Sequence, residues 1–140
     1  MALTKTDFTG LIASLKGRGL PPQYLGYFEC FNQQLFFEAH EVLEGLWLRE
    51  RGGPKDLFYK GLIQLAGAFV HVQKDRRGPA AALLHLAQAN FARYPDVFDS
   101  LELNSLGQMI QLWLGRLQEG TGSSNPLWIG PYPQLRLEAP

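Results

Sequence analysis

Proline and glycine cut this chain into segments of helical length, and these cuts restrict the fold more than any other feature of the sequence. The breaks fall at Gly17 to Pro22, Gly52 to Pro54, Gly78-Pro79, Pro95 and Gly120 to Pro126. Both residue types favour turns and interrupt helices. The segments between them are rich in good helix formers, and none alternates apolar with polar residues as a half-buried strand would. We therefore expect an all-α fold without strands.

Five helices are expected, and the connections between them decide the architecture. Short connections favour antiparallel neighbours, so the sequence predicts a compact antiparallel bundle. Residues 3–15 are a candidate for one more short helix. The five expected helices cover about residues 22–34, 36–51, 56–75, 79–94 and 105–119.

The length of 140 residues fits a single domain that spans residues 1–140. Within it we expect a bundle core at residues 22–119 and an extended, proline-rich C-terminal tail at residues 120–140. Free tails rarely carry as much apolar and aromatic surface as this one does. The tail should therefore pack on the bundle or on a partner subunit, with Trp128 and Tyr132 against helical surface.

The composition argues against several classes of function. Thirteen Lys plus Arg balance thirteen Asp plus Glu, and no basic stripe of the kind that binds nucleic acid is present. No stretch has the ~18 apolar residues of a membrane span, and none resembles a signal peptide. The single cysteine, Cys30, cannot form an internal disulfide, which agrees with a reducing compartment. We expect a cytoplasmic protein that binds neither nucleic acid nor membranes.

A histidine and a glutamate share one face of the segment at residues 36–51. At about 100° per helical residue, His40, Glu44 and Trp47 fall within about 60° of one another. On this aromatic face, the imidazole and the carboxylate are expected to be largely buried. Each would then need a hydrogen-bond partner.

The next segment, residues 56–75, is apolar around nearly its whole circumference, which is typical of a central, buried helix. Along this segment, one narrow and mostly polar stripe is formed by Lys60, Gln64, Gly67 and His71. A buried polar group without a partner costs about 1–3 kcal/mol. We therefore expect this stripe to face the helix of the histidine–glutamate pair, with Gln64 or His71 within direct or one-water reach of it.

Three interpretations of these polar groups stay open at the level of sequence. The first is a hydrogen-bonded network of His40, Glu44, Gln64 and His71 that fixes the register of two helices. The second is a divalent metal site, since bundles hold metals with imidazole and carboxylate groups on facing helices. The third is catalysis without a metal. The candidate metal ligands are His40, Glu44 and His71, and the candidate catalytic residues are Glu41, Gln64 and Lys60.

Two motifs, in their order and spacing along the chain, resemble the bacterial and archaeal family known as domain of unknown function 309. The motifs are Phe37-Glu38-x-His40-Glu41-x-Leu43-Glu44-x-x-Trp47 and Lys60-Gly61-Leu62-Ile63-Gln64-Leu65-Ala66, preceded by Phe31-Asn32 and followed by His71. With a weaker segment from Gly78 to Tyr94, the resemblance covers about half of the chain. It implies an all-α bundle and offers no established substrate. The tail after Gly120 lies beyond it.

Two functions of different classes are compatible with these features. The favoured one is a non-enzymatic module that binds itself or a protein partner, with the buried polar network as internal scaffolding. The alternative is a metal-dependent hydrolase, in which Glu41 or Gln64 orients water and Lys60 holds an anionic substrate. The hydrolase would use a divalent metal ion as its cofactor, and the sequence indicates no particular small-molecule substrate.

Overall fold

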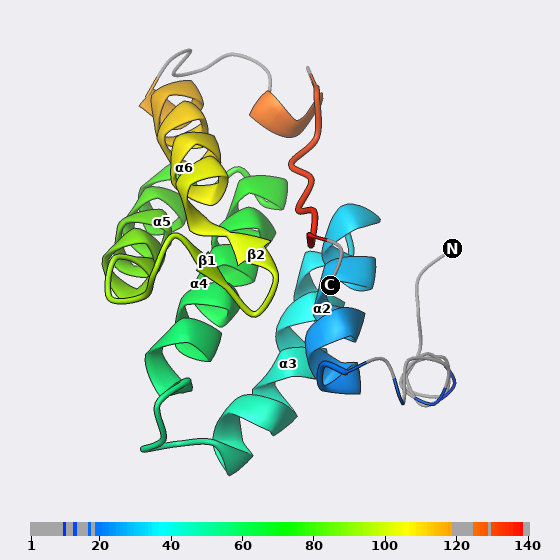
Figure 1. Cartoon of the computed structure of the whole chain (residues 1–140). Helices are drawn as coiled ribbons and strands as arrows, with labels where there is room; N and C mark the ends of the chain where they lie inside the picture. The colour runs from blue at the N-terminus through cyan, green and yellow to red at the C-terminus, as the bar shows by residue number, and fades with distance from the viewer. Residues whose placement is uncertain are drawn as a thin grey trace.

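The computed structural model describes residues 10, 13, 17, 19–118, 125–128 and 130–138, and in this part of the chain it is a bundle of five helices (Figure 1). The prediction of an all-α bundle is confirmed. Of the candidate helix at residues 3–15, only Gly10 and Ala13 lie within the described residues. The helices are α2 (Pro22–Asn32), α3 (Phe36–Arg49), α4 (Asp56–Gln73), α5 (Arg77–Phe91) and α6 (Leu103–Gln118).

Local chemistry sets the helix ends close to where proline and glycine predicted them. Pro22 occupies the first position of α2, where a missing N–H costs nothing. Beyond the end of α3, Gly52 adopts a φ of 83°, which few other residues tolerate. Helix α4 ends two residues earlier than expected, because Asp75 adopts a φ of 53° and the Arg76 N–H donates back to the carbonyl of His71 at 2.8 Å.

A small hairpin between α5 and α6 corrects the expectation that the chain has no strands. Strands β1 (Val97–Phe98) and β2 (Leu101–Glu102) pair antiparallel. The two residues between them, Asp99 and Ser100, have φ values of 46° and 64°, as a tight two-residue hairpin turn requires. Lys55 anchors the turn through an ion pair of 2.9 Å with Asp99. Strands of two residues are too short to show an alternation of apolar and polar side chains.

Helix α4 is the centre of the bundle and packs against both α3 and α5. Helix α2 covers α3, and α6 covers α5, as Figure 1 shows. Buried aromatic rings join these layers: Phe69 of α4 lies 5.6 Å from Phe31, 5.2 Å from Phe36 and 5.0 Å from Trp113 between ring centroids. Phe69 therefore links α4 to three of the other four described helices, α2, α3 and α6. None of these helices is long and apolar enough to span a bilayer.

The close approach of α4 and α5 depends on Gly61. A Cβ atom at this position would lie 2.9 Å from the ring of Phe91, which is itself buried. Gly61→Ala is therefore expected to lower the free energy of unfolding by about 1–3 kcal/mol, in spite of the higher helix propensity of alanine. Urea unfolding measures this change.

Gly45 provides the matched control for this substitution. It is an exposed position in the middle of α3. Apart from its chain neighbours and the backbone of its own helix, no atom lies within 4 Å of the Cβ that alanine would add. Gly45→Ala should stabilise the protein by about 0.5–1 kcal/mol. If both variants are stabilised alike, helix propensity alone governs these positions and the packing account of Gly61 is wrong.

The described part of the tail lies along the bundle. A short turn, η1 (Pro126–Trp128), follows Asn125, whose side chain donates to the carbonyl of Val72 at 2.5 Å and accepts the Leu127 N–H at 2.9 Å. Both Leu127 and Leu135 are buried. Tyr132 is half exposed, so its packing on helical surface stays a prediction. The side chain of Trp128 lies outside what the structure describes.

Candidate functional site

His40 and Glu44 come together as their spacing on α3 predicts, but not in the interior. The imidazole Nδ1 lies 3.6 Å from a carboxylate oxygen of Glu44, and the two side chains are 33% and 44% exposed. The ring of Phe37 lies beside the imidazole, with centroids 6.3 Å apart and planes 18° from parallel. The expectation that this pair is largely buried is therefore wrong. It stands at the border between the packed and the outer face of α3.

The polar stripe of α4 faces α5, which corrects the expected partnership with α3. The Asn90 side chain on α5 donates to the Gln64 oxygen at 2.8 Å. One turn further along α4, a Cβ at Gly67 would meet Leu83 of α5 at 3.4 Å. The predicted network joining Gln64 to His40 and Glu44 is thus replaced by a pair of amides between α4 and α5. Because α4 is apolar on nearly every side, periodicity could not tell which neighbour its stripe meets.

The remaining candidates are spread over the surface of α3 and α4. Lys60 and Glu41 are exposed, and His71 is partly buried near the end of α4. The Nδ1 atom of His71 is enclosed and lacks a hydrogen-bond partner within the described part of the chain. Among the described residues, no group of three or more His, Cys, Asp or Glu side chains could hold a metal ion. The structure does not bring His71 into the His40–Glu44 pair.

The outer face of α3 carries a feature that the sequence analysis missed. Phe37 and Leu48 are 54% and 49% exposed, and the exposed Glu41 and half-exposed Glu44 lie between them. The steps from Phe37 to Leu48 are four, three and four residues, which keeps all four side chains within about 60° around the helix. We call these four residues the α3 seam. The same spacing rule would have found it, had it been applied to the outer face.

The α3 seam is acidic as well as apolar. Every charged residue of α3 before Arg49 is acidic, namely Glu38, Glu41 and Glu44, and His40 is the only other group there that can carry charge. Two of the glutamates lie between the exposed Phe37 and Leu48. The seam therefore offers two apolar contacts that flank a negative centre.

Trp47 has a structural role beside this seam. Its indole N–H donates to Asp56 at 2.7 Å, and the Gly52 N–H donates to the other carboxylate oxygen at 2.9 Å. The bond from the Gly52 backbone, followed by the bond from Trp47, lowers the pKa of Asp56. The guanidinium of Arg51 lies 5.4 Å from the centre of the indole ring. These contacts close the turn between α3 and α4, and they fix how α3 is presented.

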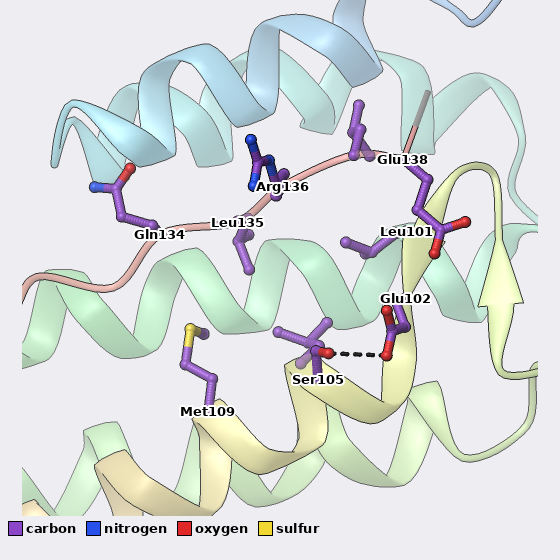
Figure 2. A pocket seen from close by; sticks show the side chains of 10 residues that line it. Leu101, Glu102, Ser105, Met109, Gln134, Leu135, Arg136 and Glu138 are labelled. Carbon is purple, nitrogen blue, oxygen red and sulfur yellow. Dashed lines mark hydrogen bonds between the residues drawn. The ribbon is translucent and has the colours of Figure 1, made fainter. Parts of the chain in front are cut away.

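A groove lies between the tail and the start of α6 (Figure 2). It has a volume of about 430 Å³ and an apolar lining that includes Leu101, Leu106 and Met109 on one side and Leu135 on the other. Glu102 faces into this region and accepts a hydrogen bond from the Ser105 hydroxyl at 2.9 Å. The groove was not predictable from the sequence, because the unexpected strand β2 forms part of its wall.

The fold and this site define a small helical bundle with an exposed acidic and apolar helix face. Residues 24–83 match the family described as Domain of unknown function (DUF309). The family resemblance is thereby confirmed over α2, α3, α4 and the first part of α5, a stretch that contains the whole α3 seam. No curated protein and no solved structure matches the chain.

Proposed function

We propose that this chain is a non-enzymatic binding module that takes a basic, amphipathic helix of another protein on the α3 seam. The observation that carries the proposal is the exposure of Phe37 and Leu48 on either side of Glu41 and Glu44. Large apolar side chains that gather on one exposed face often mark a contact surface, whereas scattered ones need no explanation.

The spacing within the seam favours a helix as the partner. Steps of four, three and four residues are those of the apolar seam along which two helices pack side by side. From Phe37 to Leu48 the seam extends about 16 Å, at about 1.5 Å per residue. A partner helix of about 14 residues would cover it.

The charges favour a basic partner over a second copy of this chain. If two copies met along the seam in antiparallel orientation, Glu41 of one would face Glu44 of the other. In parallel orientation each glutamate would face its own counterpart. Facing like charges destabilise such a contact, while lysine or arginine at the two central positions would pair with both carboxylates.

A synthetic helical peptide tests this proposal. The probe has about 14 residues, with leucine at the two outer and lysine at the two inner contact positions, and calorimetry follows its binding to the full chain. Binding is expected in dilute buffer and should weaken in about 1 M salt, where charges are screened within about 3 Å. Phe37→Ala should weaken binding about tenfold or more, because it removes an aromatic anchor.

The control for this experiment is Leu112→Ala. Leu112 on α6 is 52% exposed, like Phe37, but lies outside the seam. Its replacement should leave the affinity for the peptide unchanged. The proposal fails if the wild-type chain does not bind the probe, or if Phe37→Ala and Leu112→Ala have equal effects.

A further inference from the structure

We infer that the groove beside β2 and α6 is a peptide-binding site, which the chain's own residues 133–138 occupy and which takes an extended partner segment with large apolar side chains at alternate positions. The site shares no residue with the α3 seam, and the inference stands apart from the proposed function. Residues 133–138 are called the tail segment below. In Figure 2 this segment runs past the groove, and it forms neither a helix nor a regular strand.

The main chain of the tail segment is bound as a peptide ligand would be. The side chain of Asn32, at the end of α2, donates to the Leu135 carbonyl and accepts the Leu135 N–H, both at 2.7 Å. On the other side, the Glu138 N–H donates to the carbonyl of Ser100 at 2.6 Å, and Leu137 forms an antiparallel bridge with Leu101. Bonds to the main chain hold an extended segment whatever its side chains are.

The side chains of the tail segment alternate between the protein and the solvent. Pro133 and Leu135 are buried and Leu137 is partly buried, whereas Gln134 and Arg136 are exposed. This period of two is that of a β-strand laid on a surface. It defines what the site accepts, namely apolar side chains at every second position of an extended chain.

The tail segment does not fill the site that holds it. About 430 Å³ of open volume remains between Leu135 and the α6 side chains Leu106 and Met109. Larger side chains in place of Leu135 and Leu137 would occupy this volume and bury more apolar surface, at roughly 25 cal/mol per Å². The site therefore has room for a better ligand than its own tail.

This unused volume decides which occupant the site favours. A tethered segment has an effective concentration of about millimolar, so any competitor must bind more tightly to displace it. The tail of a second copy would make the same contacts as the resident tail, without the advantage of the tether. A partner segment with phenylalanine-sized side chains at the two leucine positions gains the extra contacts that displacement requires.

The test uses the full chain and two fluorescent peptides, followed by fluorescence anisotropy. One peptide has the sequence of residues 130–138, and the second carries Leu135→Phe and Leu137→Phe. The tail of the full chain is released by Leu135→Asp with Leu137→Asp, and circular dichroism checks that this variant is folded. The tail-released variant should bind both peptides, and the phenylalanine peptide more tightly. The wild-type chain should bind each peptide at least about tenfold more weakly, because its own tail competes for the site.

Asn32→Leu in the tail-released chain is the control within the site, because leucine has a similar size and cannot bond to the peptide main chain. It should abolish binding of both peptides. The inference is overturned if the folded, tail-released chain binds neither peptide, if wild type binds as well as the released variant, or if Asn32→Leu has no effect.

A second measurement decides the matter if the tail-released variant does not fold. Hydrogen exchange of the wild-type chain is followed with and without saturating phenylalanine peptide. The Leu135 and Glu138 amides, which donate to Asn32 and Ser100, should lose protection when the peptide displaces the tail segment. Unchanged protection at both amides contradicts the inference.

Discussion

Trp113→Ala is expected to lower the free energy of unfolding by about 3–5 kcal/mol, more than Gly61→Ala. The Trp113 side chain is buried, and its ring meets Phe69 edge-on with centroids 5.0 Å apart. The guanidinium of Arg116 lies 4.8 Å from the centre of the same ring. Alanine would leave a cavity between α4 and α6 and remove these contacts, because close-packed surroundings relax only in part.

The neighbouring Leu112 provides the control for this prediction. It precedes Trp113 on α6 and is half exposed, so Leu112→Ala should change the free energy of unfolding by no more than about 0.5 kcal/mol. Urea unfolding of wild type and both variants measures the two changes in the free energy of unfolding. All three curves are fitted with the same dependence of this free energy on urea concentration. A loss below about 1 kcal/mol at Trp113 would show that its site collapses around the missing ring.

The helices of this protein were predictable because proline and glycine mark their ends. The hairpin was not, since Asp99 and Ser100 adopt positive φ angles without glycine and each strand has two residues. The position of the tail segment was equally inaccessible. It depends on Asn32, which binds Leu135 across 103 positions of sequence, and no local pattern indicates such a pairing.

The candidate site was predicted only in part, for a physical reason. The spacing of His40 and Glu44 correctly placed them together on α3. Periodicity gives the face of a helix on which a residue lies, but not the neighbouring helix that covers this face. Gln64 of α4 was therefore expected to contact α3, although its side chain bonds to Asn90 of α5. The expected burial of His40 and Glu44 rested on the aromatic residues beside them. On α3 those groups instead border an exposed seam.

Reversal of the two seam charges should reverse the preference for the partner. Glu41→Lys with Glu44→Lys places two positive charges between Phe37 and Leu48, so it should weaken binding of the basic helical peptide by about tenfold to a hundredfold, equal to about 1.4–2.8 kcal/mol. A peptide with glutamate in place of its two central lysines should show the opposite behaviour. It should bind the reversed chain and not wild type.

The matched control reverses two acidic residues outside the seam. Glu29 on α2 and Asp96, which precedes β1, are both exposed, so Glu29→Lys with Asp96→Lys makes the same change in net charge. This control separates the local charges of the seam from long-range attraction by the whole protein.

The measurement that tests the α3 seam most directly is therefore calorimetry of three chains, wild type, seam-reversed and control-reversed, with the basic and the acidic peptide. The account predicts that wild type and the control-reversed chain bind the basic peptide alike, and that only the seam-reversed chain exchanges it for the acidic one. If the two reversed chains respond equally to both peptides, net charge alone governs binding, and the assignment of the α3 seam as the partner surface is contradicted.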